Sequence, residues 1–155
     1  VIRYSKDPIP DDIRIVTSHD GLDVLCDGPE DGILLVAHGQ LCAEALAAVD
    51  QLDSPVRVVS PRWSLPVCGG LIEEAARARA VVSVEDGLVV SGLGSHLADA
   101  LSQRGMWRPI RSLGIPQRYL DHDSRSAIMA ELGLDSRGIA DAVSQLVAQL
   151  DGEYS

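Results

Sequence analysis

The sequence predicts an α/β fold, a three-layer αβα sandwich whose sheet has about five strands, mostly parallel, with one antiparallel edge strand. Short apolar segments alternate with segments of helical periodicity along the chain, which is typical of a parallel sheet covered by helices. Residues 33–37 (ILLVA) are apolar without interruption, as in a strand buried on both faces. The 155 residues are enough for one domain with a core of its own.

The first two predicted strands, residues 22–26 and 33–37, lie on either side of the sequence DGPEDG. Glycine, proline and aspartate are typical turn residues. Two short apolar segments around a glycine-bounded turn predict a β-hairpin. We therefore expect the first strand to run antiparallel to the second, at the edge of the sheet.

The remaining elements follow from apolar periodicity and from turn and cap residues. Strands are expected at residues 56–59, 81–84 and 109–113, and helices at residues 41–52, 71–80, 92–104 and 124–132. Asp123 or Ser124 should cap the 124–132 helix, and Gly133 should end it. Asp135 should cap a last helix, whose apolar stripe consists of Ile139, Val143, Leu146, Val147 and Leu150.

Three regions are predicted along the chain. Residues 1–20 are expected to be the end of a preceding domain and a linker, because two prolines and three aspartates between positions 7 and 12 favour an irregular, solvated segment. Residues 21–150 are expected to form the folded domain. Residues 151–155 are expected to be an acidic tail that frays.

The charge and cysteine content exclude several classes of function. Thirteen basic and 23 acidic residues give a formal net charge of −10, which opposes binding to nucleic acid or to an anionic membrane surface. No apolar run approaches the roughly 18 residues of a membrane span. Cys26, Cys42 and Cys68 form no C-x-x-C pair. We therefore expect buried free thiols, a cytoplasmic location, and no nucleic-acid or membrane partner.

The segment Gly92-Leu93-Gly94-Ser95 is the main candidate for a binding site. It follows a predicted strand and opens a predicted helix, where backbone N–H groups can hold a phosphate. Leu97 stands at the third glycine position of the dinucleotide fingerprint, and the chain has no Walker lysine. Two interpretations stay open: a freestanding nucleotide-binding module that uses this segment, or glycines that let the helix start close to the sheet.

No catalytic or metal site is predicted. The chain contains no G-x-S-x-G motif, and the adjacent Ser95 and His96 do not suit a nucleophile and its base. Residues 121–123 (DHD) are consecutive, whereas ligands on one helix face lie three or four residues apart, so a polar turn is favoured. His38 ends an apolar strand at the carboxyl edge, where α/β sheets bind ligands, but a structural, hydrogen-bonded histidine is favoured.

Four segments together resemble a known family. They are ILLVAHG (33–39), SPRWSLPV (60–67), VSVEDGLVVSGLGS (82–95) and GIPQRYLDHDSRSAIMAELGL (114–134). In this order and spacing they resemble the C-terminal domain of 1-deoxy-D-xylulose-5-phosphate synthase, which belongs to the transketolase-like thiamine diphosphate superfamily. The resemblance covers essentially the whole chain, and the pair P-R-W-x-x-P and V-E-D-x-x-x-x-x-G-x-G-S is its most specific part.

The resemblance implies a transketolase C-terminal-like fold in a fragment of a longer enzyme. That enzyme condenses pyruvate with glyceraldehyde 3-phosphate and releases CO₂, and its product feeds isoprenoid, thiamine and pyridoxal synthesis. Its cofactors, thiamine diphosphate and Mg²⁺, are bound upstream, so the resemblance implies no cofactor in this chain and no activity of the chain alone. The expected partners are the upstream domains and the second subunit of a homodimer.

The resemblance also implies one candidate site residue. The family recognises the substrate phosphate with a basic residue at the end of a pattern like R-Y-P-R, and R-Y-S-K at residues 3–6 places Lys6 there. A cationic side chain suits a phosphate. Ser5 replaces the usual proline and Asp7 the usual glycine, so an ordinary solvated linker lysine is the alternative.

Other positions depart from the family pattern, among them His38, Ser60, Gly87, Ser91 and Asp123. All are expected at strand ends or in loops, so they leave the fold prediction unchanged. They indicate a diverged copy, and a fragment of an inactive paralogue is therefore a further alternative.

Overall fold

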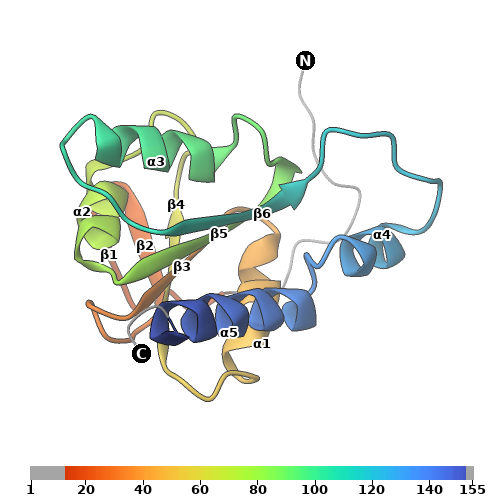
Figure 1. Ribbon diagram of the computed structural model, residues 1–155, viewed down its shortest axis with the longest axis horizontal. Helices are drawn as coiled ribbons and strands as arrows, with labels where there is room; N and C mark the ends of the chain where they lie inside the picture. Colours follow the sequence, from red (N-terminus) through yellow and green to blue (C-terminus); the bar gives the residue numbers. More distant parts are fainter. Residues whose placement is uncertain (1–12, 153–155) are drawn as a thin grey trace.

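The computed structural model describes residues 13–152, which form a six-stranded mixed sheet with helices on both faces (Figure 1). The strand order is β1-β2-β4-β3-β5-β6. The strands are β1 (Thr17–His19), β2 (Leu22–Cys26), β3 (Ile33–Ala37), β4 (Val56–Pro61), β5 (Ala80–Leu88) and β6 (Ile110–Ile115). The helices are α1 (Leu41–Val49), α2 (Gly69–Arg77), α3 (Leu93–Ser102), α4 (Arg125–Glu131) and α5 (Ser136–Gly152). The predicted class is confirmed, with one strand more than expected.

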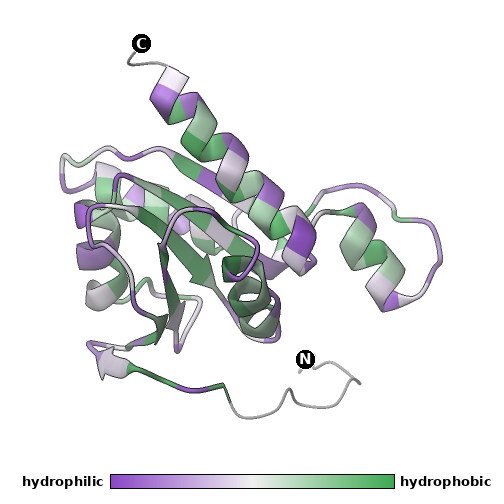
Figure 2. Cartoon of the chain, turned by 90° about the horizontal axis from the view of Figure 1, so that it is seen from below, coloured by the Kyte–Doolittle hydropathy of each residue, from purple (hydrophilic) through white to green (hydrophobic). Residues whose placement is uncertain are grey.

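Each face of the sheet is covered by a separate apolar layer. On one face, Leu35 of β3 and Val82 of β5 pack with residues of α1, α4 and α5. On the other face, Leu34 and Val81 of the same strands pack with residues of α2 and α3. Figure 2 shows the hydrophobic sheet (green) enclosed between the helices. These layers form the predicted three-layer sandwich.

β3 is the centre of the sheet. All five of its residues are buried, and it pairs in parallel with β4 on one side and with β5 on the other. β6 continues the parallel part of the sheet beyond β5. The uninterrupted apolar run of β3 correctly predicted its burial, because a central strand between two helix layers has no exposed face.

The predicted hairpin is wrong. β2 runs antiparallel beside β4, with Leu22 opposite Pro61 and Val24 opposite Val59, and does not pair with β3. Because β3 already has a parallel neighbour on each side, β2 cannot pair with it, and it extends the sheet beyond β4 instead. β1 lies in the segment predicted as linker and pairs antiparallel with β2. β1 therefore runs in the same direction as β3–β6, so β2 is the one antiparallel strand, as predicted, but the edge of the sheet is formed by β1 and not by β2.

The predicted helix caps are confirmed. The Ser124 hydroxyl accepts the backbone N–H of Ala127 at 3.2 Å and caps α4, and Asp135 Oδ1 accepts the N–H of Gly138 at 2.8 Å at the start of α5. Residues 151–152 continue α5, so the frayed tail predicted there is wrong for these two residues. None of the described helices has the length and apolar character needed to cross a membrane.

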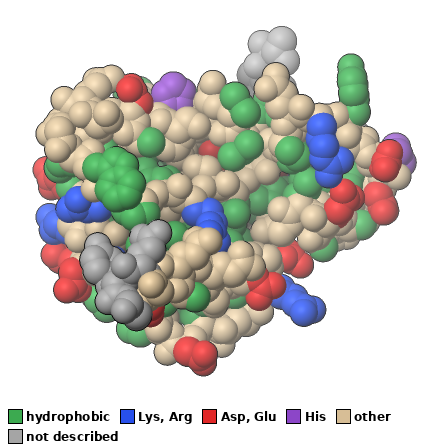
Figure 3. All heavy atoms as spheres, viewed as in Figure 1, with side chains coloured by type: hydrophobic (Ala, Val, Ile, Leu, Met, Phe, Trp, Pro, Cys, Tyr) green, Lys and Arg blue, Asp and Glu red, His purple; other side chains and the backbone are tan. Residues whose placement is uncertain are grey.

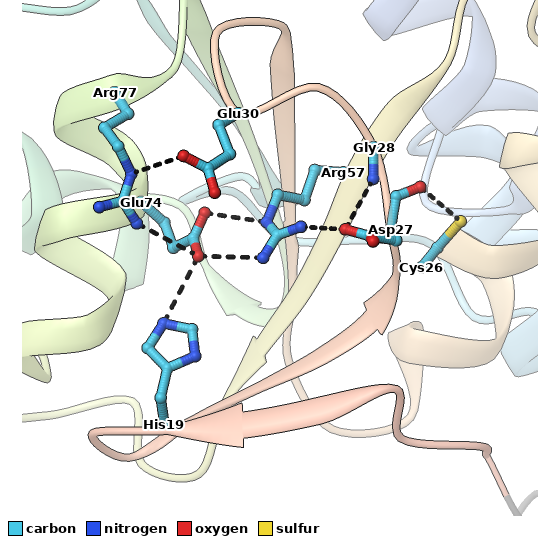
Figure 4. Close-up of polar contacts among 8 residues, drawn as sticks. All are labelled: His19, Cys26, Asp27, Gly28, Glu30, Arg57, Glu74 and Arg77. Carbon is cyan, nitrogen blue, oxygen red and sulfur yellow. Dashed lines mark hydrogen bonds and ion pairs between the residues drawn. The ribbon is translucent and has the colours of Figure 1, made fainter.

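A buried ion cluster joins β4, α2 and the end of β2 (Figure 4). Arg57 of β4 donates to the Glu74 carboxylate from Nε at 2.9 Å and from Nη2 at 3.2 Å. Its Nη1 pairs with Asp27, which directly follows β2. His19 Nε2 lies 3.4 Å from Glu74 Oε1, and Arg77 pairs with the same oxygen at 3.5 Å. The cluster ties the antiparallel edge of the sheet to α2.

The two central groups of this cluster are buried, since Arg57 is 8% exposed and Glu74 is 2% exposed. Burial alone would lower the pKa of Arg57, but the hydrogen bond and charge of Glu74, together with Asp27, outweigh it and raise the net pKa. Such a pair is costly to break, because the remaining charge keeps its desolvation penalty without its partner.

We expect Glu74→Ala to lower the free energy of unfolding by about 3–5 kcal/mol, because it leaves Arg57 charged and buried without its main partner. Glu73 is exposed on the same helix, so Glu73→Ala is the matched control and should change stability by less than about 0.5 kcal/mol. Urea denaturation followed by circular dichroism measures both variants. A loss below about 1 kcal/mol for Glu74→Ala would contradict this role of the cluster.

Candidate functional site

The parallel strands end at one edge of the sheet, and the segments beyond them form a small polar cavity. In open α/β sheets, ligands bind at this carboxyl edge. The cavity has a volume of about 330 Å³. It is lined by His38, Gly39, Gln40, Ser64, Glu85, Asp86 and Gly87. These residues follow β3 and β4 or lie in the last part of β5.

His38 and Ser64 are hydrogen-bonded at this cavity. His38 Nδ1 lies 3.2 Å from the backbone oxygen of Pro61, and its Nε2 lies 2.8 Å from Ser64 Oγ. Because a carbonyl oxygen only accepts, Nδ1 carries the proton of the neutral ring and Nε2 accepts the Ser64 hydroxyl. The predicted hydrogen-bonded histidine is confirmed. No sequence pattern indicates Ser64, because it is 26 residues away from His38.

Glu85 of β5 lies against the start of α3. Burial raises the pKa of Glu85, while the backbone N–H groups of Leu93 and Gly94, and the positive charge that His38 and His96 carry when protonated, lower it in part. The net pKa is above the ordinary value of a glutamate. The carboxylate thus takes the position at a helix N-terminus where an anionic ligand would bind.

Gly92 and Gly94 allow a close approach between α3 and the sheet. A Cβ at Gly92 would overlap Glu85 Oε1, and a Cβ at Gly94 would overlap the hydroxyls of Ser83 and Ser112. Any side chain here would force these neighbours to shift. Of the two interpretations of this glycine segment, the geometry favours the second, in which the glycines let the helix start close to the sheet.

The other candidates from the sequence are surface features. Ser95 Oγ donates to the backbone oxygen of Val89 at 3.2 Å. Asp123 Oδ1 accepts the Ser124 N–H at 2.6 Å, as expected for a polar turn before a helix. In the described part of the chain, no three His, Cys, Asp or Glu side chains are placed to hold a metal ion. Lys6 lies outside the described residues, so its role stays a prediction.

The three cysteines are free thiols, as expected. Cys42 is buried as predicted, but Cys26 and Cys68 are only partly buried, so the predicted burial is wrong for these two. Burial raises the pKa of the Cys42 thiol, although its hydrogen bond with Ser60 opposes this in part. A raised pKa keeps the thiol protonated and unreactive at neutral pH.

Comparison with known proteins identifies the family. The family model described as transketolase, C-terminal domain, matches residues 23–139. The match covers strands β3–β6 and every residue of the cavity. The chain belongs to the transketolase C-terminal domain family. The fold implied by the sequence resemblance is thereby confirmed.

Curated relatives of this transketolase C-terminal domain are named 1-deoxy-D-xylulose-5-phosphate synthase. The synthase 2 of Streptomyces avermitilis is 41% identical over 99% of the chain, and that of Streptomyces coelicolor is 42% identical over 99%. The synthase of Mycobacterium sp. strain KMS is 39% identical over 96%. The chain spans about a quarter of the length of these relatives, 25%, 25% and 24% respectively.

Solved structures share the fold of this transketolase C-terminal domain. A split-gene transketolase, described as an inactive β4 tetramer, has a TM-score of 0.69 and 29% sequence identity, and the match covers 84% of this chain and 42% of that one. Transketolase from Pichia stipitis has a TM-score of 0.62 and 18% identity, over 86% of this chain and 19% of that one. At 18% identity, the similarity to the Pichia stipitis enzyme shows only that the two proteins share the fold.

We expect Glu85→Gln to remove a pH dependence of stability. The pKa of Glu85 in the folded chain is raised above its unfolded value, so its contribution is fully present below the unfolded pKa and is lost as pH rises through the folded pKa. The stability of the wild type should therefore fall relative to Glu85→Gln as pH rises from about 4.3 toward neutrality. Chemical denaturation at a series of pH values measures this difference.

Glu73→Gln is the control for this experiment, because Glu73 is exposed and its replacement should leave the pH profile of the wild type in place. Stability differences between wild type and Glu85→Gln that stay constant across this range would show that Glu85 has the same pKa in the folded and unfolded chain.

Proposed function

We propose that this chain is the C-terminal domain of a cytoplasmic 1-deoxy-D-xylulose-5-phosphate synthase. The parent enzyme joins pyruvate to glyceraldehyde 3-phosphate with release of CO₂, and it uses thiamine diphosphate and Mg²⁺. The observation that carries the proposal is the identity of 41% and 42% over 99% of the chain to relatives with this name. Because the chain spans 25% of those relatives, the activity is assigned to the longer protein.

The described residues do not fit the cofactor themselves. A thiamine diphosphate site needs oxygen ligands for Mg²⁺ and N–H donors for the diphosphate. The glycine-rich start of α3 already faces the Glu85 carboxylate. No three metal-ligating side chains come together within residues 13–152. We therefore assign no step of the synthase reaction to this chain.

Exposed apolar side chains support a role in assembly. Five of the eight large hydrophobic residues that are exposed within residues 13–152 lie at the ends of β4, β5 and β6 or in the segments that follow them. They are Trp63, Leu65, Leu88, Val90 and Tyr119. Because these three strands are parallel, their ends lie along one edge. Clustered apolar side chains of this kind mark protein interfaces.

The shape of the domain agrees with such an interface. The connection from β6 to α4, together with α4, extends away from the sheet (Figure 1), and Tyr119 in this connection is fully exposed. Hydrophobic side chains reach the surface between charged ones on the face shown in Figure 3. We infer that the carboxyl edge packs against the cofactor-binding domains of the parent enzyme, which acts as a homodimer.

We expect the 155-residue chain alone to form no product from pyruvate and glyceraldehyde 3-phosphate and to keep its melting temperature in thiamine diphosphate and Mg²⁺. A ligand that binds only the folded state raises stability by RT ln(1 + [L]/Kd), so a site would cause a concentration-dependent shift. Differential scanning fluorimetry and a mass-spectrometric product assay measure the two quantities.

The longer protein that carries this domain is the positive control, and it should bind both cofactors and form 1-deoxy-D-xylulose 5-phosphate. Product formation or a saturable shift with the 155-residue chain alone would contradict the assembly role. Failure of the longer protein to form the product would contradict the assignment of the parent enzyme.

A further inference from the structure

We propose that a cavity beside the start of β6 binds a phosphate monoester that carries a flat ring. The cavity lies between the second halves of α3 and α5 and includes the connection from α3 to β6. Its volume is about 520 Å³, within the range for small-molecule sites. The polar and aromatic side chains that line it are Ser102, Trp107, Arg108, Arg111 and Gln149.

This cavity lies away from the carboxyl edge of the sheet. β6 is an edge strand, and in Figure 1 it runs between α3 and α5. The cavity is at the start of this strand, and none of its lining residues belongs to the exposed apolar segments for which we infer a partner domain. The inferred interface and this cavity therefore use different parts of the surface.

The two arginines of the cavity have no carboxylate partner within residues 13–152. Six other described arginines are ion-paired with Asp or Glu, namely Arg57, Arg62, Arg77, Arg79, Arg118 and Arg125. Arg108 and Arg111 donate only to neutral oxygens, and no Asp or Glu is among the residues that line the cavity. In a chain with a net charge of −10, two guanidinium groups without a counter-charge favour an anionic ligand.

Backbone carbonyls hold the Arg108 guanidinium in place. Its Nε donates to the oxygen of Ala78 at 3.0 Å, its Nη1 to that of Trp107 at 2.7 Å, and its Nη2 to that of Ala76. A guanidinium has five N–H donors, so two donors remain that no described residue accepts. The Arg108 side chain is thus fixed at the end of α2 and can still donate to a ligand.

Arg111 of β6 is held by α5 in the same way. Its Nη1 donates to the backbone oxygen of Ala142 at 3.0 Å and to Gln145 Oε1 at 3.5 Å, and its Nη2 donates to Gln149 Oε1 at 2.6 Å. The Nε donor and one Nη2 donor have no acceptor among the described residues. Two adjacent N–H groups of this kind match the two oxygens that a phosphate presents to an arginine.

Trp107 gives the cavity an aromatic surface. Its side chain is 78% exposed, and it stands directly before Arg108 in the chain. An indole ring stacks on other flat rings, so a ligand with a ring beside its anionic group can contact both residues. The two guanidinium charges match the charge of about −2 on a phosphate monoester better than the single charge of a carboxylate. The cavity therefore suits an aromatic phosphate monoester.

NMR titration of the 155-residue chain with phenyl phosphate tests this site. The chain has two tryptophans, Trp63 and Trp107, so a nitrogen–proton correlation spectrum shows two indole N–H signals, which Trp63→Phe assigns. We expect the Trp107 signal to shift saturably with a Kd below about 1 mM and the Trp63 signal to stay in place. No saturable shift of the Trp107 signal, or equal shifts of both signals, would overturn the proposal on the wild-type chain alone.

Arg111→Gln should raise the Kd for phenyl phosphate at least about tenfold, because it removes charge-assisted hydrogen bonds to the phosphate. Arg118→Gln is the matched control, since Arg118 is exposed and lies outside the cavity, and it should bind like the wild type. Melting curves check that both variants fold. Equal Kd values for the two variants would overturn the assignment of the phosphate to Arg111.

Methyl phosphate tests the ring, because at about pH 8 it has the same charge as phenyl phosphate. The wild type should bind phenyl phosphate about threefold or more tightly than methyl phosphate. Trp107→Ala, followed by its backbone amide signals, should bind the two esters equally. Equal affinities of the wild type for both esters would overturn the assignment of a flat ring. None of these titrations uses the synthase reaction, so their failure is distinct from failure of the proposed function.

Discussion

β3 has to be buried on both faces, and most of the fold follows from this requirement. Its five residues are apolar and buried, and its backbone pairs with β4 and β5 on its two sides. Such a strand needs a helix layer on each face, which α1 and α5 provide on one face and α2 and α3 on the other. The covered faces hold mainly apolar side chains, with the paired Arg57 and Glu74 between β4 and α2, and the polar cavity lies at the carboxyl ends of the strands.

Two carboxylates, the buried Glu74 and the half-buried Glu85, connect the outer elements to this centre, and each has its own means of compensation. Glu74 of α2 is held by the guanidinium of Arg57 on β4, so a charged pair joins that helix to the sheet. Glu85 of β5 faces the N–H groups at the start of α3, where the helix dipole favours a negative charge. The same contact explains why a glycine-rich helix start, which resembles a phosphate site, is occupied by the chain itself.

Local sequence patterns correctly predicted the features that depend on residues adjacent in sequence. Examples are β3 and the caps Ser124 and Asp135, because the apolar character of a strand and the capping of a helix are set by a few consecutive residues. The position of β2 is decided by which strands already flank β3, so the turn sequence after β2 misled the prediction. Likewise, His38 and Ser64 come into contact because β3 and β4 are neighbours in the sheet. No local sequence motif predicts this strand order.

Hydrogen exchange of the domain within its parent enzyme, compared with the isolated 155-residue chain, tests the assembly role most directly. We predict slower exchange in the parent enzyme for the amides of residues 62–68, 88–92 and 116–124, because a partner surface covers the apolar side chains of these segments. The amides of α2 should exchange at the same rate in both. Slower exchange confined to α2, with the three carboxyl-edge segments unchanged, would contradict this role.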